Sequence, residues 1–414
     1  MVRRHHGQLH HRLTRRTALT LLQHLDVSPG TSPGRLVAAV AAALEGSGPA
    51  LLPRTRDSAP QTPTAPAETP VQDAPDGTAA VVATSGSTGR SKQVLLPAQA
   101  LHASASGTHQ HLGGPGQWLL ALPAQHVAGF QVLVRSALSG TVPVPLPGGA
   151  FSAASLHRAV TTMTGRRRYT ALVPTQLRRV LADPAATEAL ASLDGVLVGG
   201  AALPAPLAEA ARAAGVAIVR TYGMTETAGG CVYDGRPLPG VRVSTDGDGR
   251  LRLHGPVVAT GYRGDPELTR ARFGSGPHGR SFLTDDAGRV EADGSLTVLG
   301  RLDDVITTGG VKVAPRTVEE ALLALPAVGD AVVLAVPDEE WGQRVAAVCV
   351  PAPAAAAAPD RPGTDAVRQA LRDRLPPAAL PRQLVWLDAV PVLASGKPDR
   401  VALVRMLAAG DGTM

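Results

Sequence analysis

Glycines, hydroxyl groups and one lysine are gathered in the segment TSGSTGRSK at positions 84–92. Glycines let backbone N–H groups close around phosphate oxygens, while hydroxyls and an ammonium group add further donors. The spacing differs from that of a Walker loop, which disfavours P-loop NTPase chemistry. We therefore expect a phosphate loop of another kind, although a solvated Ser/Gly turn would share this composition. Its candidate ligands are Thr84, Ser85, Gly86, Ser87, Thr88, Gly89 and Lys92.

A second reactive combination is the segment TYGMTET at 221–227, which follows an apolar run at 216–220. Sheets of parallel strands bind ligands at the carboxyl ends of those strands. Tyr222 offers a ring that can stack on a base, Thr225 offers a hydroxyl, and Glu226 offers a carboxylate that can hold Mg²⁺. An ordinary strand-end loop is the alternative, but two such segments in one chain favour a nucleotide site.

Charged residues recur in FLTDD at 282–286 and in LGRLDDVITTGGVKVAP at 299–315. A carboxylate can bind ribose hydroxyls, and Arg301 can neutralise phosphate charge. An aspartate pair at 303–304 lies at an expected domain junction and is followed by two glycines at 309–310. Charged turns between strands would give the same pattern, so these residues gain weight only from the other segments.

Lysine is rare in this chain, which makes its positions informative. Of the 40 cationic residues, 37 are arginine and three are lysine, at Lys92, Lys312 and Lys397. Isolated lysines in an arginine-rich chain indicate sites that need a compact, flexible ammonium group instead of a planar guanidinium. Lys397 lies in PVLASGKPDR at 391–400, a loop bounded by glycine and proline. We expect its charge to act on an anion, although terminal lysines are commonly just solvated.

The elements that must position these residues fall into two expected domains. Apolar runs alternate with helix-length segments, which predicts an α/β domain with largely parallel strands. The runs lie at 79–83, 118–123, 170–174, 195–200 and 216–223. Residues 241–300 resemble antiparallel hairpins with DG turns, and the residues after 301 resemble a separate α+β unit.

The expected fold class is therefore α/β, with a large N-terminal domain at 17–300 and a small, mobile C-terminal α+β domain at 301–414. The large domain should contain mixed, largely parallel sheets flanked by helices, plus an antiparallel β subdomain.

Three features are expected of the N-terminal region. Residues 1–16 contain five arginines and no acidic residue, which indicates a disordered basic tail. Leucines at helical spacing predict two helices within 18–44. Five prolines among Thr, Ala and Gln indicate a stiff linker or surface loop at 57–77. We expect core structure to begin after this linker.

Composition excludes several classes of protein. Every apolar run is cut before it reaches the ~18–20 residues of a membrane span. Only Cys231 and Cys349 occur, which rules out a disulfide framework and suits a reducing cytoplasm. The net charge of +6 comes largely from the N-terminal tail, and aromatic residues are too few for a single-strand binder. We therefore expect a cytoplasmic protein that binds neither nucleic acid nor membrane.

The four reactive segments, in this order and spacing, resemble the adenylate-forming superfamily of acyl-CoA synthetases, peptide-synthetase adenylation domains and luciferases. The resemblance covers residues 79–400. The segments LPAQHVAGFQVLVRS, VPTQLRRVL, GGAAL and YGMTETAGGCVYDG further resemble the o-succinylbenzoate:CoA ligases of menaquinone synthesis. Three departures occur: TDD replaces TGD at 284–286, Gln125 replaces a usual aromatic residue, and the first half of the large domain is short.

The resemblance implies an AMP-forming reaction in two steps. A carboxylate attacks the α-phosphate of ATP bound with Mg²⁺, and CoA then displaces AMP to give a thioester. The small domain is implied to rotate between the steps about Asp303, bringing Gly309 and Gly310 to a CoA channel. The catalytic residues implied are Lys397, Thr225, Glu226 and His126, with Glu226 as the metal ligand. The nucleotide contacts implied beyond the phosphate loop are Gly200, Ala201, Tyr222, Gly223, Asp286 and Arg301.

The resemblance also implies a set of substrate contacts. Because o-succinylbenzoate carries two carboxylates, the one that does not react needs a cation. Arg135 and Arg179 are the candidates, with surface salt bridging as the alternative for each. For His126 the alternative is a purely structural histidine, and Lys312 has no role beyond helping to bind a CoA phosphate. The substrate-binding set is His126, Arg135, Thr175, Arg179 and Gly199.

Other functions stay open at this point. Another aryl- or acyl-CoA ligase, or a stand-alone enzyme that loads a carrier protein, would use the same motifs. A non-catalytic nucleotide or nucleic-acid binder is a remote alternative, because every motif position that does chemistry is filled. The partners we expect are a small carboxylate, ATP and CoA, and a homodimer is left open.

Overall fold

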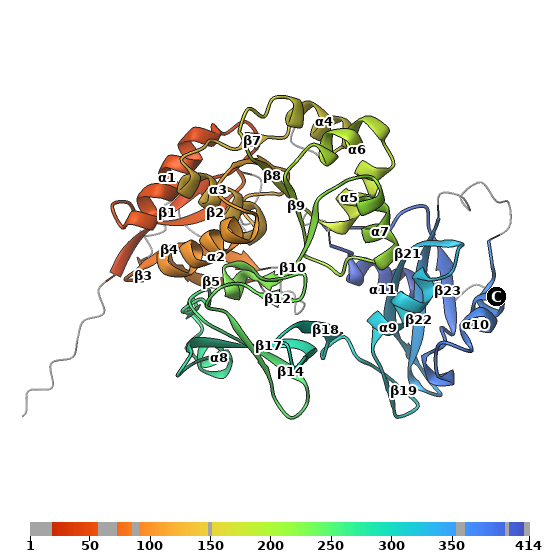
Figure 1. The fold of residues 1–414 in the computed structure, drawn as a ribbon. Helices are drawn as coiled ribbons and strands as arrows, with labels where there is room; N and C mark the ends of the chain where they lie inside the picture. The colour runs from red at the N-terminus through yellow and green to blue at the C-terminus, as the bar shows by residue number, and fades with distance from the viewer. Residues whose placement is uncertain are drawn as a thin grey trace, which may run out of the picture.

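The computed structural model describes residues 19–56, 73–84, 91–147, 151–352, 361–393 and 397–409. Figure 1 shows a large part that runs from red to teal and a smaller part beside it that runs from cyan to blue, joined through the chain that follows β18. Within the described residues, no helix combines the length and the apolar character needed to cross a bilayer.

A six-stranded mixed sheet carries the N-terminal half of the large part. Its strand order is β15-β5-β4-β2-β1-β3, with parallel pairing only between β4, β2 and β1. Its strands are β1 (Leu19–Asp26), β2 (Ala50–Arg54), β3 (Asp73–Pro75), β4 (Thr78–Thr84), β5 (Lys92–Pro97) and β15 (Gly261–Tyr262).

A seven-stranded sheet forms the centre, in the order β12-β11-β10-β9-β8-β6-β7. Pairing is parallel from β7 to β10 and antiparallel from β10 to β12. All four residues of β9 are buried, as expected for a parallel strand covered on both faces. The strands are β6 (Gln117–Leu120), β7 (Val144–Pro145), β8 (Arg168–Leu172), β9 (Gly195–Val198), β10 (Ile218–Met224), β11 (Gly229–Tyr233) and β12 (Arg236–Pro237).

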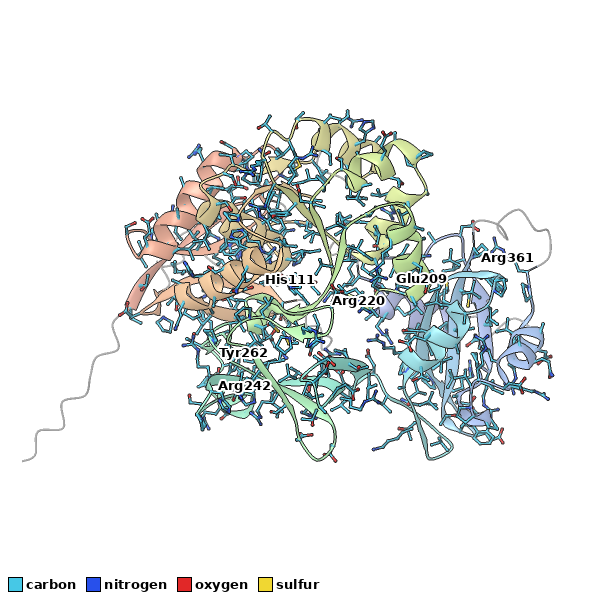
Figure 2. The ribbon with its side chains drawn as sticks, in the orientation of Figure 1. His111, Glu209, Arg220, Arg242, Tyr262 and Arg361 are labelled. Carbon is cyan, nitrogen blue, oxygen red and sulfur yellow. The ribbon has the colours of Figure 1, made fainter. Side chains whose placement is uncertain are left out.

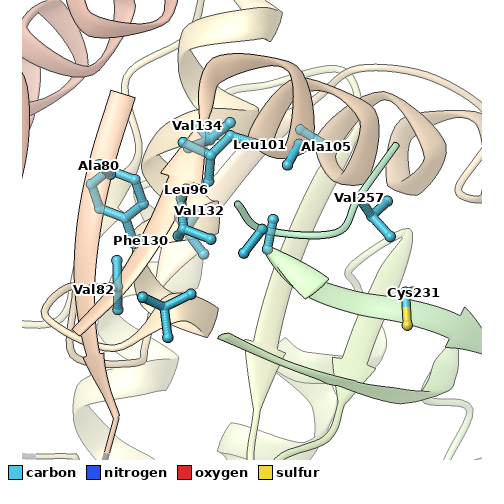
Figure 3. Close-up of a cluster of buried hydrophobic side chains, with 14 of the residues drawn as sticks. Ala80, Val82, Leu96, Leu101, Ala105, Phe130, Val132, Val134, Cys231 and Val257 are labelled. Carbon is cyan, nitrogen blue, oxygen red and sulfur yellow. The ribbon is translucent and has the colours of Figure 1, made fainter. Parts of the chain in front are cut away.

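Helices cover both faces of the seven-stranded sheet. One core joins α1, α2 and α3 to strands of both sheets, and Figure 3 shows Phe130 and Val134 of α3 packed with Ala80, Val82 and Leu96. A second core packs α4 to α7 on the opposite face. The helices are α1 (Pro33–Glu45), α2 (Ala98–His111), α3 (Val127–Ser139), α4 (Ala153–Thr161), α5 (Pro174–Leu181), α6 (Pro184–Ala191) and α7 (Ala205–Ala213).

An antiparallel subdomain follows β12. Strands β13, β14, β17 and β16 form a sheet in that order, and β18 pairs with β17. β17 is long enough to pair along its length with β14, β16 and β18. The elements are β13 (Arg242–Thr245), β14 (Arg250–His254), α8 (Pro266–Arg272), β16 (Phe273–Gly276), β17 (Gly279–Val290) and β18 (Leu296–Arg301).

The small part packs helices on both faces of a three-stranded sheet in the order β21-β22-β23. One face carries α9 and α10, and the other carries α11. Its elements are β19 (Ile306–Thr308), β20 (Val311–Val313), α9 (Pro315–Leu323), β21 (Val328–Asp338), β22 (Gly342–Pro351), α10 (Thr364–Leu371), the 3-10 turn η3 (Pro377–Ala379), β23 (Gln383–Trp386) and α11 (Arg400–Ala409).

The predicted fold class is confirmed, whereas two local predictions are wrong. Only the second of the two helices expected within 18–44 forms, because the first leucine-rich run becomes β1 and pairs with β2 and β3. Core structure begins before the expected linker 57–77, since Leu36, Val40 and Leu51 are buried in the main core, and β3 with fully buried Ala74 lies inside the linker. Residues 57–72 and the basic tail at 1–16 lie outside the described residues. The domain boundaries stay predictions.

Candidate active site

Tyr222 and Asp286 meet where β10 ends. The Tyr222 hydroxyl donates a hydrogen bond of 2.7 Å to Oδ2 of Asp286, which lies in β17. The pairing of β10 with β11 shifts register between Tyr222 and Gly223. A methyl group at Gly223 would lie 2.2 Å from the carbonyl oxygen of Gly229, so only glycine allows this close approach. The motif therefore holds the tyrosine ring beside the carboxylate expected to bind ribose.

Arg301 connects Asp286 with the expected hinge. Its guanidinium makes a two-pronged pair with Asp303, at 2.8 Å from Nε to Oδ1 and 2.5 Å from Nη2 to Oδ2. Its Nη1 lies 3.7 Å from Oδ1 of Asp286. Burial opposes the charge of Arg301, but the two aspartates outweigh it and raise its pKa. Burial raises the pKa of Asp286, against the Tyr222 hydrogen bond and the Arg301 charge.

Glu226 is buried at the next turn of the motif. Thr225–Thr227 form the 3-10 turn η2, and Ala228 follows in the left-handed region with φ 51°. The Tyr262 hydroxyl donates a hydrogen bond of 2.8 Å to Oε1 of Glu226. Burial and the Glu226 charge raise the pKa of Tyr262, so this hydroxyl stays protonated and keeps donating. A carboxylate held in this way keeps oxygen lone pairs for a cation.

The expected phosphate loop joins β4 to β5. Thr84 ends β4 and Lys92 begins β5, and the two are register partners in an antiparallel hairpin. The ammonium group of Lys92 lies 5.6 Å from the centre of the Tyr262 ring, so Tyr262 connects Lys92 with Glu226. The remaining loop positions lie outside the described residues, namely Ser85, Gly86, Ser87, Thr88 and Gly89.

The small part brings Lys397 to this site. The loop that carries it is closed by a bridge between Val392 and Pro398 and by a hydrogen bond of 2.8 Å from Leu393 N to the Lys397 carbonyl. A methyl group at Gly200 would lie 4.0 Å from Cε of Lys397. Gly200 also has φ +79°, a conformation that favours glycine. The GGAAL segment after β9 thus leaves room for the lysine side chain.

The ammonium group of Lys397 lies among the charges of the nucleotide end. Burial and the Arg301 charge lower the pKa of Lys397, while the charges of Asp286 and Glu226 raise it. The charge of Lys397 also acts on His126, the N-cap residue of α3. Burial and the Lys397 charge lower the pKa of His126, which favours a neutral imidazole. The structure therefore brings together five of the expected catalytic and nucleotide residues.

Arg135 lies deeper, in the core beneath α3, and is 3% exposed. Its guanidinium lies 4.8 Å from the centre of the Trp118 ring, and Nη2 donates a hydrogen bond of 3.5 Å to the Tyr233 hydroxyl. Thr108 shares a hydrogen bond of 2.8 Å with the same hydroxyl. Among the residues that the structure describes, no carboxylate forms an ion pair with Arg135, and burial lowers its pKa. A fully buried cation without an anion is costly.

Four buried polar atoms near Arg135 also lack a hydrogen-bond partner within the described part of the chain. They are Nε1 of Trp118, Oε1 of Gln131, Nε of Arg135 and Oγ of Ser136. Gln131 links this group to the nucleotide end, because its Nε2 donates a hydrogen bond of 2.6 Å to the carbonyl of Ala228. The polar face of α3 therefore lies directly behind the TYGMTET segment. Such atoms normally find a partner in protein, water or ligand.

The other expected substrate contacts lie on α5 and after β9. Thr175 is half-buried in the first turn of α5, and Arg179 is exposed in its last turn. A methyl group at Gly199 would lie 2.2 Å from Oγ1 of Thr221, so the chain packs closely there, and the exposed Ala201 follows. The roles of these residues stay predictions.

The expected CoA-channel glycines form the turn between β19 and β20. Gly309 and Gly310 both have positive φ, at 55° and 79°. A methyl group at Gly309 would lie 2.5 Å from the ring of Trp341, and the Gly309 N–H donates a hydrogen bond of 3.0 Å to the Trp341 carbonyl. Lys312 is exposed in β20. The tryptophan therefore shapes this turn, whereas the channel itself stays a prediction.

Sequence reasoning missed three aromatic residues that the site uses. Tyr262 binds Glu226, while Trp118 and Tyr233 hold the Arg135 guanidinium. Aromatic residues make up only 3% of the chain. The rarity that singled out the lysines could have drawn attention to these rings as well.

This chain is similar to a family of enzymes and to several known proteins. The family of AMP-binding enzymes matches residues 18–262, and the C-terminal domain of AMP-binding enzymes matches residues 317–397. A probable 2-succinylbenzoate–CoA ligase of Mycobacterium tuberculosis is 44% identical over 396 residues, covering 94% of this chain and 99% of its own length. A 2-succinylbenzoate–CoA ligase of a Geobacillus species is 30% identical, covering 80% of this chain and 70% of its own length.

Solved structures show the same fold. The o-succinylbenzoate CoA synthetase of Bacillus subtilis, in complex with its acyl-adenylate intermediate, is 28% identical with a TM-score of 0.65, covering 79% of this chain and 69% of that one. An amide bond synthetase of Marinactinospora thermotolerans is 26% identical with a TM-score of 0.70, covering 92% of this chain and 84% of that one. Because the family match covers residues 18–262, more than half of its length, this chain belongs to the family of AMP-binding enzymes.

Proposed function

We propose that this chain is an AMP-forming acid:CoA ligase that converts 2-succinylbenzoate, ATP and CoA into 2-succinylbenzoyl-CoA, AMP and pyrophosphate. The observation that carries the proposal is the position of Lys397, whose ammonium group interacts with Asp286, Glu226 and Arg301 at the nucleotide end. The relatives named as 2-succinylbenzoate–CoA ligases support the choice of acid. The product would serve menaquinone synthesis.

The first half-reaction joins two anions, so its main cost is charge repulsion. Tyr222 and Asp286 would hold the base and the ribose, while the phosphate loop and Lys92 would hold the outer phosphates. Thr225 would contact the α-phosphate, and Lys397 would bridge that phosphate and the attacking carboxylate. Charges fixed in advance where negative charge develops are an effective source of catalysis.

The residues present suit Mg²⁺ as well. Magnesium takes one or two protein carboxylates and completes its shell with water and phosphate oxygens. Glu226 is a single buried carboxylate with one oxygen bonded to Tyr262, and it would hold the ion. When bound, the ion offsets phosphate charge.

The second half-reaction needs a different arrangement of the small part. We infer that it rotates about Asp303, withdraws Lys397 and presents the turn at Gly309 and Gly310 to the thiol of CoA. The neutral form of His126 would line the path of the thiol or the acyl group. The CoA sulfur then attacks the acyl carbon, and AMP leaves with the electrons of the broken acyl–oxygen bond.

The unreacted carboxylate of 2-succinylbenzoate would pair with Arg135. Its guanidinium is buried without an ion-pair partner in the described chain, and its Nε is one of four unsatisfied polar atoms in that region. A dicarboxylate would supply the missing anion, whereas a fatty acid would leave the cation unpaired. Arg179 is exposed, so its charge carries no comparable cost of burial. We therefore assign the binding of the unreacted carboxylate to Arg135 alone.

The test is AMP release from ATP by purified protein, with 2-succinylbenzoate, benzoates and fatty acids, each with and without CoA. We expect release that depends on both 2-succinylbenzoate and CoA. Turnover with another acid only would keep the ligase chemistry and reject the substrate, and transfer to a carrier protein in place of CoA would reject the acceptor. We also place the enzyme in the cytoplasm, in keeping with its two buried free cysteines.

A further inference from the structure

Arg178 of α5 crosses from the large part of the molecule to the small part. Its Nη1 donates a hydrogen bond to the Gly329 carbonyl, and its Nη2 lies 3.3 Å from Oδ1 of Asp330. Both partners belong to β21, which packs in the core of the small part. Arg178 is half-buried, and within the described residues its guanidinium has no hydrogen-bond or ion-pair partner other than Gly329 and Asp330.

The sequence prepares both sides of the contact. On one side, Pro174 opens α5, and buried Leu177 and Val180 fix the helix so that Arg178 projects toward β21. On the other side, the pairing of β21 with β22 skips Gly329, which leaves that residue without a register partner. A β-bulge of this kind frees a carbonyl from the strand ladder. A methyl group at Gly329 would lie 2.7 Å from the carbonyl oxygen of Pro351, so only glycine fits.

Asp330 completes the acceptor side. The backbone N–H of Ala331 donates a hydrogen bond of 3.0 Å to its Oδ1, the atom that also faces Arg178. Burial raises the pKa of Asp330, and the Arg178 charge acts in the opposite direction. Asp330 is half-buried, so separating the two parts of the molecule would break this ion pair and return both charged groups to water.

The same docked arrangement is the one that holds Lys397 at the nucleotide end. We propose that Arg178 is a positioning residue for the first half-reaction, which latches β21 to α5 whenever Lys397 is engaged with the nucleotide and must release it before the thiol step. This inference rests on the proposed two-step function. It assigns to Arg178 and Asp330 a role that no motif in the sequence indicates.

The test separates the two half-reactions in single-turnover experiments. Arg178→Ala should slow formation of acyl-adenylate from ATP and acid by about tenfold, the size expected for losing charge-assisted bonds across one contact. Thioester formation from pre-made acyl-adenylate and CoA should be unchanged or faster. Arg178→Lys, which can restore one bond, should recover most of the lost rate.

Asp330→Ala and the exchange Arg178→Asp with Asp330→Arg sharpen the test. The single change should act in the same direction, and the exchange should recover part of the adenylation rate. Arg158→Ala is the matched control, because Arg158 is an exposed arginine on α4 that contributes nothing to the contact. Equal loss of both half-reactions in Arg178→Ala, or no loss in either, would overturn the latch.

A distance measurement reads the docking directly. Spin labels at Glu188→Cys on α6 and Arg372→Cys after α10 lie on exposed positions of the two parts, and the native cysteines are both buried. With ATP bound, the wild-type background should show one dominant distance, and Arg178→Ala should shift population to others. An unchanged distribution would overturn the latch, whereas failure of the wild type to form adenylate would instead reject the proposed function.

Discussion

The nucleotide end and the core beneath α3 differ in whether their buried charges are paired. At the nucleotide end, Asp286 has both Tyr222 and Arg301, and Arg301 in turn has Asp303. Beneath α3, Arg135 has an aromatic face and a hydroxyl but no carboxylate within the described chain. We call the first region completed, because Asp286 has its cation within the described chain, and the second incomplete, because Arg135 has no anion there.

In the proposed function, this difference separates binding of the nucleotide from selection of the acid. The nucleotide can be bound by side chains that the protein already holds in position through its own hydrogen bonds. These side chains then need no reorganisation during the reaction. A particular acid can be selected by leaving a buried cation that only a second carboxylate satisfies, because unpaired buried charges are strongly disfavoured. Figure 2 shows His111 at the end of α2 and Tyr262 in β15, both in the large part of the molecule.

The largest effect should come from Lys397, which the small part adds to the completed nucleotide end. Lys397→Ala should lower the rate of acyl-adenylate formation by roughly 10²–10³-fold, as for the removal of one fixed donor from a developing negative charge. Conversion of pre-made acyl-adenylate to thioester should stay near the wild-type rate. Rapid-quench assays of each half-reaction measure both, and a similar loss in the two would reject the assigned role.

Arg135→Met should remove the discrimination that the incomplete region provides. The ratio of kcat/KM for 2-succinylbenzoate to that for its analogue without the ring carboxylate should fall by about a hundredfold, which corresponds to about 2.7 kcal/mol. Because the change also removes an unpaired buried cation, the free protein should resist urea at least as well as the wild type. A large loss of stability, or an equal loss with both acids, would contradict this explanation.

The pKa of His109 depends on its burial and on the charge of Arg135. Burial and the Arg135 charge lower its pKa from 6.5 to about 4. Between these values the unfolded chain binds the proton and the folded chain does not, so the free energy of unfolding falls as pH decreases. We expect a loss of about 2 kcal/mol between pH 7 and 4.5 that disappears in His109→Gln.

Urea unfolding at several pH values measures this slope. The matched control is His102→Gln, because His102 lies on the same helix but is exposed. A slope that persists in His109→Gln, or that vanishes in His102→Gln, would show that other groups cause it.

The smallest effect on activity should come from removing the hydrogen bond between Tyr222 and Asp286 at the nucleotide end. Tyr222→Phe removes the hydroxyl that donates to Asp286, and it should raise KM for ATP about fivefold. Because that hydrogen bond lowers the pKa of Asp286, its loss should also move the acid limb of adenylation to higher pH. Initial rates from pH 5 to 8 test both shifts. Tyr169→Phe serves as the control, because the Tyr169 hydroxyl donates to the backbone oxygens of Leu112 and Gly114.

The sequence predicts the completed region better than the incomplete one. Tyr222, Glu226, Asp286 and Lys397 lie in short motifs whose chemistry can be recognised residue by residue. The partner of Glu226, in contrast, is Tyr262, which stands 36 residues further along and depends on the pairing of β15 with β5. Contacts that arise only when strands pair over long separations leave no local signal.

The same limit explains the errors in the fold. The run LTLLQHLD at 19–26 has leucines at helical spacing, yet pairing with β2 and β3 makes it a strand. Tertiary pairing overrides such local preferences. Arg178 and Arg179 look alike in sequence, and only the contact of Arg178 with β21 distinguishes them.

The most direct measurement is a crystal structure of this chain with the sulfamoyl analogue of its 2-succinylbenzoyl-adenylate. We predict that the ribose lies on Asp286, that Lys397 stays at the nucleotide end, and that the free carboxylate of the ligand lies within hydrogen-bond distance of the Arg135 guanidinium. A ligand whose free carboxylate faces solvent or another cation, with Arg135 still unpaired in the core, would contradict the central claim.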